Sequence, residues 1–268
     1  MTRFLVYDVF TDRPFGGNQL AVIPDARDLP EDRLQKIARE FNFSETVFLY
    51  PGATWRARIF TPGMEVPFAG HPTVGAGVAL AEMGEGPELV LELGIGPVRL
   101  ELGDGAAAFT VTKPLEVLAE VEADLVARAL GLPPEAILGQ PVKAGVGLDF
   151  VLAELDSRAS LAACQPVTDV FREGAARYPQ GLDFAIYPYV RDGAEIRARM
   201  FAPLDGIPED PATGSAAAAL AARLGPGDFV LHQGVEMGRP SRIELSAGPE
   251  GVRVAGRAVR TMEGRLTL

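Results

Sequence analysis

The sequence is poor in residues that bind metals or form covalent cross-links. Cys164 is the only cysteine among 268 residues, which excludes an intramolecular disulfide and a zinc site made of several thiolates. His71 and His232 are the only histidines, too few for a metal site built from clustered imidazoles. We therefore expect this chain to work without a bound metal ion.

Long apolar runs and an excess of positive charge are also missing. The longest apolar run, AAAALAA at residues 216–222, is far shorter than the roughly 20 residues that span a bilayer. Asp8 interrupts the N-terminal segment MTRFLVYDVF before the apolar region of a signal peptide can form. The formal net charge of −11 disfavours nucleic acid and anionic membranes as partners. We expect a cytoplasmic protein that binds neither.

What the chain does contain is a long internal repeat. RARIFTP at residues 56–62 recurs as RARMFAP at residues 197–203, and the segments before them, VFLYP and FAIYP, also match. Further along, PVRLEL finds a counterpart in PSRIEL. The matched segments follow in the same order, which chance rarely produces. The chain therefore reads as two copies of one unit, residues 1–113 and 114–268.

The segments that follow Pro72 and Pro211 read as buried helices. TVGAGVALAEM and TGSAAAALAARL carry no polar face for two turns, and a helix that is apolar on all sides is a buried one. Strand-like runs such as FLVYDVF and ETVFLY surround them, and amphipathic helices are expected at residues 31–40 and 121–130. We predict an α+β fold with two pseudo-symmetric halves, each a curved mixed β-sheet rolled around a central buried helix. The active site would lie in the cleft between the halves, and the last strand could cross back to the N-terminal half.

Both predicted helix starts favour an anionic ligand. Pro72 and Pro211 suit the first turn of a helix, where a backbone N–H has no intrahelical partner. The free N–H groups there, with the positive end of the helix dipole, form an anion site. A small carboxylate-bearing substrate fits two such helix starts that face one cleft. Two ordinary buried helix starts, capped by nearby side chains, are the alternative.

Several longer segments carry a resemblance to a known family. GGNQLAV, NFSETVF, FTPGMEVPFAGHPTVGAG, FAPLDGIPEDPATGSAA and QGVEMGRPSRI together resemble the PhzF-like family, named for the phenazine-biosynthesis isomerase. The resemblance implies the fold of diaminopimelate epimerase, in which two similar halves each roll a sheet around a helix. It also implies a homodimer, and an isomerase that acts on trans-2,3-dihydro-3-hydroxyanthranilate without a metal or organic cofactor. The family is broad, so the substrate does not transfer with the fold.

Glu45 is the first candidate for acid/base chemistry. It alternates with Phe43, Val47 and Leu49, so it lies on a face that is otherwise apolar. Desolvation on such a face would raise the pKa of Glu45 and suit it to exchange a proton near neutral pH. The resemblance implies that Glu45 is the family's general acid/base, whereas an edge-strand glutamate facing solvent is the plain alternative. Its counterpart in the second copy is Leu182, so the acid is not duplicated.

His71 and Asp210 occupy matching places, each just before the proline of a predicted helix start. The positive helix end disfavours the charged form of the histidine, and Asp210 could simply be an N-cap. By resemblance both residues are catalytic or orient the substrate. Also by resemblance, Gly70, Gly214 and Ser215 hold the substrate carboxylate.

Two groups of residues receive plainer interpretations. Asn18 follows two glycines and reads as a turn residue rather than a ligand contact. The four arginines of the repeat are interpreted as marking solvated strand faces: Arg56, Arg58, Arg197 and Arg199.

The absence of a cysteine at each helix start excludes one of the possible reactions. A two-thiol racemase needs a cysteine at each helix start, but these regions read AGHPT and EDPATGS, and Cys164 in LAACQPV reads as a core residue. We favour a cofactor-independent isomerase of a small carboxylate, in which Glu45 moves a proton between carbons. An epimerase or racemase that uses Glu45 with His71 or Asp210 is the second possibility. A protein that binds such a ligand without turnover is the third.

Overall fold

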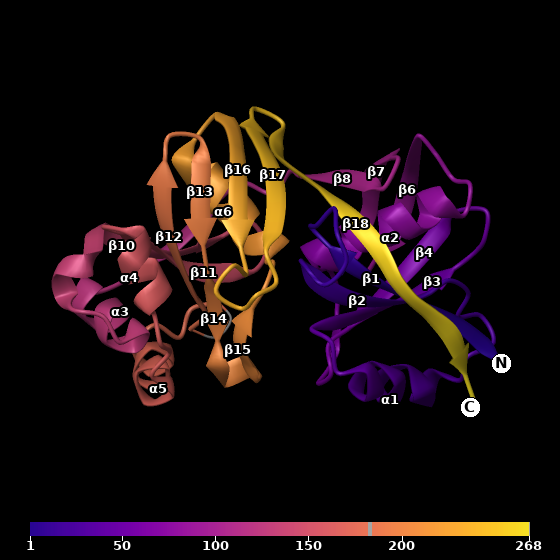
Figure 1. The fold of residues 1–268 in the computed structure, drawn as a ribbon, viewed down its shortest axis with the longest axis horizontal. Helices are drawn as coiled ribbons and strands as arrows, with labels where there is room; N and C mark the ends of the chain where they lie inside the picture. The colour runs from indigo at the N-terminus through magenta and orange to yellow at the C-terminus, as the bar shows by residue number, and fades with distance from the viewer. Residues whose placement is uncertain (182–183, 268) are drawn as a thin grey trace. The chain divides into compact units, whose positions relative to one another are not determined.

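The chain forms two compact units in the computed structural model, which describes residues 1–181 and 184–267. Unit 1 comprises residues 1–110 together with residues 253–268, and unit 2 comprises residues 111–252. The long last strand, β18 (Gly251–Leu266), begins at the end of unit 2 and continues through unit 1, where it is drawn in yellow in Figure 1.

Unit 1 is a mixed sheet with two helices. Its helices are α1 (Glu31–Phe41) and α2 (Gly70–Glu82). Besides β18, its strands are β1 (Thr2–Val9), β2 (Asn18–Ile23), β3 (Glu45–Tyr50), β4 (Trp55–Phe60), β5 (Glu65–Val66), β6 (Glu88–Leu93), β7 (Gly96–Gly103) and β8 (Ala106–Val111).

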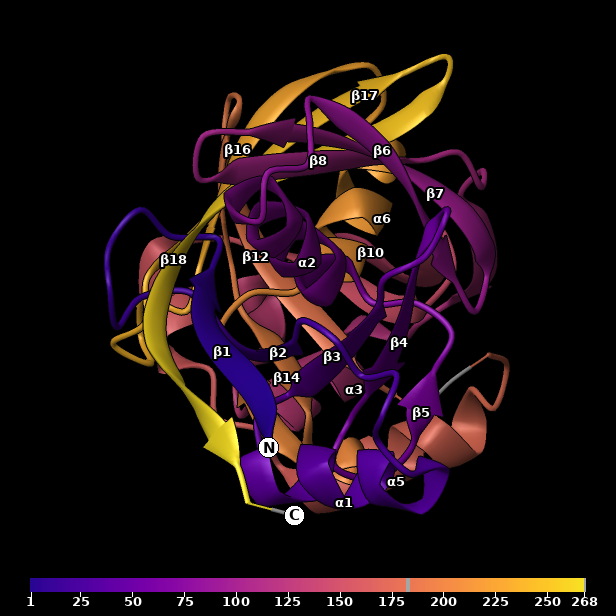
Figure 2. The ribbon, with the colours of Figure 1, turned by 90° about the vertical axis from the view of Figure 1, so that its right-hand side faces the viewer.

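The strands of unit 1 close on themselves around α2. β1 pairs with β2, and β2 runs parallel to β3. β3 pairs with β4, which runs parallel to β6, and β6, β7 and β8 form a meander. β8 pairs with β18, and β18 returns antiparallel to β1. Figure 2 shows α2 inside this curve of strands.

Helix α2 is buried because its small residues let the strands approach closely. Every residue from Gly70 to Leu80 is buried. A β-carbon at Gly75 would lie 2.4 Å from Cδ2 of Leu20, and one at Gly77 would lie 2.7 Å from Cβ of Ala107. Gly75 and Gly77 therefore have a packing role, and the prediction of a helix that is buried on all sides is confirmed.

Helix α1 covers the opposite face of strands β2, β3 and β4. Its buried residues Leu34, Ile37 and Ala38 pack against Phe48 and Phe60 in a separate apolar cluster. The helix ends at Asn42, which adopts the left-handed conformation and donates its N–H to the carbonyl of Ala38. The helix predicted at residues 31–40 is thereby confirmed.

Unit 2 also combines a curved mixed sheet with a central helix, α6 (Gly214–Leu224). Its other helices are α3 (Ala123–Leu130), α4 (Arg158–Ala163) and α5 (Thr168–Arg177), with short 3₁₀ turns η1 (Pro134–Ala136) and η2 (Pro203–Asp205). Its strands are β9 (Glu116–Glu120), β10 (Ile137–Gly145), β11 (Asp149–Leu155), β12 (Ile186–Asp192), β13 (Glu195–Ala198), β14 (Met200–Ala202), β15 (Ile207–Asp210), β16 (Gly227–Gln233) and β17 (Ser241–Gly248).

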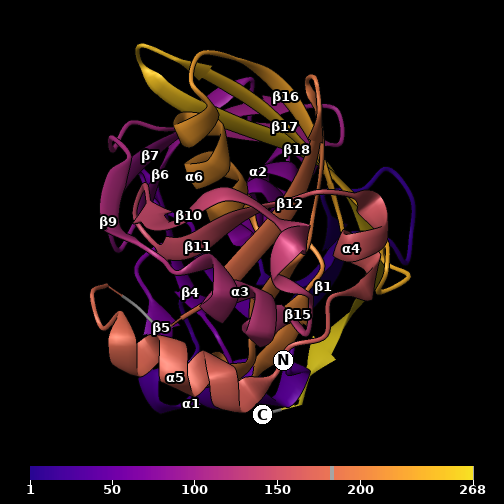
Figure 3. The ribbon, with the colours of Figure 1, turned by 90° about the vertical axis from the view of Figure 1, so that its left-hand side faces the viewer.

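The pairing in unit 2 runs β9–β10–β11–β12–β13–β16–β17, with parallel pairs β11–β12 and β13–β16. Helix α6 packs against strands β10, β11, β16 and β17, and residues Ala216 to Ala221 are fully buried. Helices α3 and α5 lie side by side away from α6 in Figure 3 and share a second apolar cluster with β11 and β12. The α+β fold class predicted from the sequence is confirmed.

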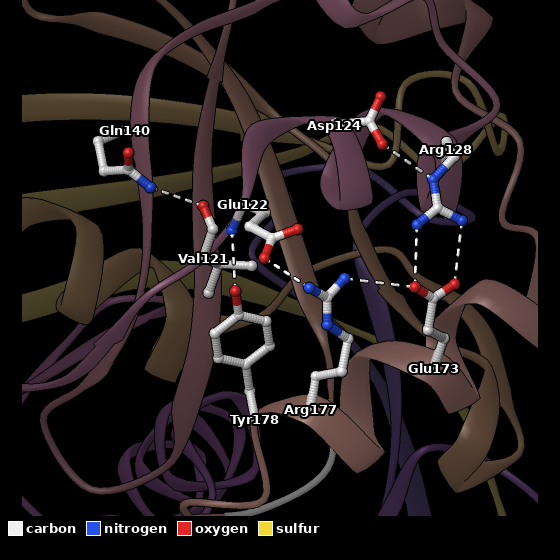
Figure 4. Close-up of polar contacts among 8 residues, drawn as sticks. All are labelled: Val121, Glu122, Asp124, Arg128, Gln140, Glu173, Arg177 and Tyr178. Carbon is white, nitrogen blue, oxygen red and sulfur yellow. Dashed lines mark hydrogen bonds and ion pairs between the residues drawn. The ribbon is translucent and has the colours of Figure 1, made fainter.

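Surface ion pairs join α3 to α5 above that cluster (Figure 4). Arg128 binds Glu173 through two hydrogen bonds of 3.0 Å each, and Arg177 binds both Glu173 and Glu122. The hydroxyl of Tyr178 accepts a hydrogen bond from the N–H of Glu122 at 3.1 Å. Because exposed ion pairs contribute little in water, the apolar cluster beneath them provides most of the stability of this region.

One of the four repeat arginines is not on a solvated face. Arg199 is only 7% exposed, and its guanidinium donates to the carbonyl oxygens of Leu161, Ala162 and Cys164 at the end of α4. It also forms two hydrogen bonds with Glu209. The prediction of a solvated face is therefore wrong for Arg199, because these acceptors replace water around the charge.

Within residues 1–181 and 184–267, no helix has both the length and the apolar character needed to cross a membrane.

Candidate functional site

In unit 1, the structure brings Glu45 and His71 into contact. Glu45 is the first residue of β3, opposite Leu20 of the parallel strand β2, and His71 is the second residue of α2. Their side chains meet with 3.2 Å between Oε2 of Glu45 and Nδ1 of His71. The side chain of Glu45 is 17% exposed and that of His71 is 4% exposed. A substrate could therefore reach the carboxyl group more readily than the imidazole.

The partners of His71 identify where its proton lies. Burial lowers the pKa of His71 to about 3, so its imidazole is neutral and carries a single N–H. Nε2 lies 3.3 Å from the carbonyl oxygen of Gln19, which can only accept, so the N–H is assigned to Nε2. Nδ1 is then an acceptor, and the oxygen that faces it, Oε2 of Glu45, is buried. A proton bound by the Glu45 carboxyl group would therefore have Nδ1 as an acceptor 3.2 Å away.

The sequence predicted a neutral histidine at this position, and the direction of the pKa is confirmed. The reason differs from the one expected. The largest cause is removal of the imidazole from water rather than the helix dipole.

Asn18 has a different role from the one predicted. It is the first residue of β2 and is buried, and its side-chain oxygen accepts a hydrogen bond from the hydroxyl of Ser44 at 3.3 Å. The interpretation as a turn residue is wrong, because pairing with Val9 draws Asn18 into the sheet. Asn18 thus supports the residue next to Glu45.

The sequence interpretation did not select Asp8 as a residue near this group. Asp8 is buried in β1 opposite Gln19, and its carboxylate accepts the N–H of Phe15 at 2.7 Å. It thereby anchors the loop between β1 and β2. The signal was present in the sequence, since an acid inside the apolar run FLVYDVF has to be satisfied when it is buried.

The start of α2 follows the prediction. Gly70 is its first residue, and Pro72 lies in the first turn, where its missing N–H costs no hydrogen bond. The N-cap position is Ala69, whose side chain cannot accept a hydrogen bond. Gly70 therefore provides the first backbone N–H of α2, and the side chain of the N-cap residue accepts no hydrogen bond from this helix start.

The start of α6 differs from the prediction. Helix α6 begins at Gly214, so Pro211 is not in its first turn, and the N-cap position belongs to Thr213 rather than to Asp210. Asp210 is instead the last residue of β15 and pairs with Met200. The expectation fails because side chains from other strands bind the carbonyl oxygens of this segment and keep it outside the helix.

Asp210, Gly214 and Ser215 nevertheless lie within six positions of each other around this helix start. The hydroxyl of Thr213 donates to Oδ2 of Asp210 at 2.5 Å. Gly214 and Ser215 are the first two residues of α6, with Gly214 buried and Ser215 partly exposed. The joint action of this group with Glu45 and His71 stays a prediction. Leu182, the counterpart of Glu45, lies outside the described residues.

Gln233 and Tyr187 were not selected from the sequence. Gln233 is fully buried at the end of β16, and its side chain contacts both Asp210 and Thr213. Tyr187 donates its hydroxyl hydrogen to Gln233 at 2.9 Å. Gln233 does lie within the segment QGVEMGRPSRI that resembles the family, which is the signal that could have identified it.

No cluster of three or more histidine, cysteine or acidic side chains suited to a metal occurs in the described part of the chain. Cys164 is buried in an apolar cluster, and burial raises the pKa of its thiol to about 12. The prediction that Cys164 is a core residue is confirmed.

A cavity of about 270 Å³ in unit 1 lies at the other end of α2 from His71. Its lining combines strands β1 and β18 with the last turn of α2: Arg3, Leu5, Tyr7, Ala79, Glu82, Met83 and Arg260. The hydroxyl of Tyr7 donates to Glu82 at 2.9 Å, and both arginines lie close to glutamates. Its charges are therefore largely compensated within the protein, and the cavity contains none of the predicted site residues.

Comparisons with known proteins agree over nearly the whole chain. Residues 7–264 match the family model for phenazine biosynthesis-like proteins, PhzC-PhzF. A protein of Mesorhizobium japonicum described as an uncharacterised isomerase is 39% identical over 98% of both chains. The trans-2,3-dihydro-3-hydroxyanthranilate isomerase of Pseudomonas aeruginosa is 36% identical over 100% of both chains. A crystal structure of a PhzF-family phenazine biosynthesis protein from Bacillus anthracis has a TM-score of 0.88 and 25% identity, covering 100% of this chain and 99% of the other.

Proposed function

Since this chain belongs to the PhzC-PhzF family of phenazine biosynthesis-like isomerases, we propose that it isomerises a small carboxylate-bearing substrate by acid/base proton transfer, without a metal or organic cofactor. One C–H bond of the substrate breaks, another forms, and a double bond moves between the two carbons. The reaction involves no net oxidation or reduction, so it needs no co-reactant.

The contact between Glu45 and His71 carries this proposal. Oε2 of Glu45 lies 3.2 Å from Nδ1 of His71, so a proton on the Glu45 carboxyl group would have an acceptor beside it. Glu45 gives this proton to one substrate carbon and takes a proton from another. His71 stays neutral throughout, and the Gln19 carbonyl fixes the orientation of its ring, so Nδ1 can accept a hydrogen bond from the protonated carboxyl group and orient it. Positioned groups of this kind contribute roughly 10²–10⁴-fold to a rate.

The helix starts supply the proposed binding groups for the substrate carboxylate. Gly70 offers the first N–H of α2, while Gly214 and Ser215 offer two N–H groups and a hydroxyl at the start of α6. Asp210 orients the substrate or assists in proton transfer. We propose that these groups bind the substrate carboxylate, as the resemblance implied.

The substrate to test first is trans-2,3-dihydro-3-hydroxyanthranilate, which the relative from Pseudomonas aeruginosa is named for. It carries a carboxylate for the helix starts and a carbon framework in which a double bond can move.

We also propose that the protein is a cytoplasmic homodimer. Sedimentation of the purified protein measures its mass directly and so tests the dimer.

The decisive experiment follows the proton. Chelator-treated protein is incubated with this compound in D₂O, and NMR spectra record where deuterium enters and whether a double bond moves. We expect deuterium on carbon together with double-bond movement, at the same rate with and without chelator. Change of configuration without double-bond movement would show an epimerase instead. Activity that is lost on chelation and restored by one divalent ion would contradict the proposal.

A further inference from the structure

Gln233 makes a complete set of hydrogen bonds beside Asp210. Its Nε2 donates to the carbonyl oxygen of Asp210 at 2.7 Å and to the hydroxyl oxygen of Thr213 at 3.0 Å. Its Oε1 accepts from the hydroxyl of Tyr187 at 2.9 Å and from the backbone N–H of Thr213 at 3.2 Å. The amide cannot be flipped, because the Asp210 carbonyl can only accept and the Thr213 N–H can only donate.

This arrangement fixes the direction of the next hydrogen bond. Since Oγ1 of Thr213 accepts from Gln233, its single hydrogen remains for Oδ2 of Asp210, 2.5 Å away. Hydrogen bonds to a carboxylate are short and strong, and they favour its ionised form. Gln233 thus directs the Thr213 hydroxyl that donates to the Asp210 carboxylate, while its own hydrogen bond to Asp210 goes to the backbone carbonyl.

Long-range contacts hold the same segment in place. The hydroxyl of Ser241 shares its single hydrogen between the carbonyl oxygens of Pro211, at 2.9 Å, and Gln233, at 3.1 Å. A β-carbon at Gly234 would lie 2.7 Å from the carbonyl oxygen of Pro211, and Gly234 has a positive φ of 72°. The end of β16 is therefore pressed against the segment that carries Asp210.

We infer that Gln233 is a positioning residue that acts through Thr213 to fix the carboxylate of Asp210. The inference rests on the proposed function, which gives Asp210 a role in the reaction. Gln233 and Thr213 contact Asp210 within unit 2, so the hydrogen bonds can be tested without any substrate.

The first test observes the carboxylate directly. The protein is prepared with ¹³C-carboxyl aspartate, and the resonance of Asp210 is identified by its loss in Asp210→Asn. At one fixed pH, Thr213→Val removes the donor and shifts this resonance, while Thr213→Ser keeps the hydroxyl and leaves it in place. Gln233→Met, which has similar length and no charge, shifts it in the same direction as Thr213→Val.

A double-mutant cycle then separates positioning from packing. If Gln233 acts through Thr213, Gln233→Met causes little further shift in the Thr213→Val background. Additive shifts, or a resonance that is unmoved in Thr213→Val, would overturn the inference. Should Gln233→Met fail to fold, the Thr213→Val and Thr213→Ser pair decides whether the hydroxyl controls the carboxylate.

Turnover of trans-2,3-dihydro-3-hydroxyanthranilate supplies the functional readout. We expect Thr213→Val to lower kcat by roughly 10²-fold, the effect of a misplaced reacting group, with a much smaller change in KM and recovery in Thr213→Ser. Wild-type turnover in Asp210→Asn would remove Asp210 from the proposed function. That result would leave the resonance test intact, so the two failures can be told apart.

Discussion

The two copies of the repeat share one structural device and differ in its surroundings. In both units the guanidinium of the second arginine lies over the ring of the phenylalanine two residues later, at 5.1 Å for Arg58 and 4.8 Å for Arg199. Arg58 binds Glu65 through hydrogen bonds of 2.7 and 2.6 Å, and Arg199 binds Glu209 through two of 2.8 Å. The repeated heptapeptide therefore encodes an arginine clamp across a strand hairpin.

The third partner of each arginine clamp is different. Arg58 reaches the side chain of Glu31 at the start of α1, and 22% of its own side chain is exposed. Arg199 reaches three backbone carbonyls at the end of α4, and its side chain is 8% exposed. The same sequence thus gives a solvated clamp in unit 1 and a buried clamp in unit 2.

The side chains that follow each clamp along the chain differ between the two units. The hairpin held by Arg58 is followed by His71, which contacts Glu45. The hairpin held by Arg199 ends at Asp210, which contacts Thr213. The duplicated scaffold therefore retains its clamps, while the groups at the helix starts have become an acid–imidazole pair in one unit and a hydroxyl-bound carboxylate in the other.

The largest effect is expected where the two units differ most, at Glu45. Glu45→Gln keeps the shape of the side chain but cannot exchange a proton at neutral pH, so turnover should fall by roughly 10²–10⁴-fold. Substrate affinity should change much less, because the helix starts are untouched. Turnover, affinity and melting temperature are measured on one preparation, with the exposed Glu40→Gln as control. Unchanged turnover would transfer the acid/base role to Asp210 with His71.

The next largest effect is expected from the buried clamp. Arg199→Met leaves Glu209 and three carbonyls without their donor, so the free energy of unfolding should fall by about 3–5 kcal/mol, the usual cost of breaking a buried pair. Denaturant unfolding measures this loss. Arg197→Met, on the neighbouring and less buried arginine, serves as the control. An equal loss in both variants would show that burial does not distinguish the two arginines.

These contrasts show what the sequence could predict. The burial of α2 follows from its lack of a polar face, and the resemblance named both Glu45 and His71, which the structure brings into contact. The first prediction depends on a local sequence pattern. The second depends on segments whose roles the family resemblance supplies together. The α+β class could likewise be predicted, because strand-like runs and apolar helices alternate along the chain.

Long-range contacts explain what the sequence could not predict. Arg199 looks like any strand arginine until α4 brings carbonyl oxygens to it. Pro211 looks like a helix start until Ser241 and Gln233, from strands β17 and β16, bind its segment and keep it outside the helix. No local pattern encodes these partners, since they are separated from their targets by more than twenty positions.

The third prediction concerns the stability of the protein at acidic pH, which depends on His71 at the start of α2. The pKa of His71 is lowered by burial to about 3 in the folded protein, against about 6.5 when unfolded. Below pH 6.5 the unfolded chain takes up a proton that the folded chain does not, so stability falls as the pH falls towards 3. One such group accounts for a loss of about 2 kcal/mol by pH 5.

Unfolding titrations at pH 7 and pH 5 test this effect, with His71→Gln as the matched variant. The variant cannot titrate, so its loss of stability between the two pH values should be smaller than that of the wild type. An identical loss in both proteins would show that His71 is protonated in the fold, as an imidazolium paired with Glu45 carboxylate would be.

The smallest effect is expected from the solvated clamp. Arg58→Met removes contacts to Glu31 and Glu65, but both glutamates can regain water, because Glu31 is 75% and Glu65 is 41% exposed. The loss of unfolding free energy should therefore be several-fold smaller than in Arg199→Met, and salt should reduce it further by screening. Denaturant unfolding of both variants at low and high salt measures the difference. Equal losses, insensitive to salt, would mean that the hairpin geometry rather than burial determines what an arginine clamp contributes.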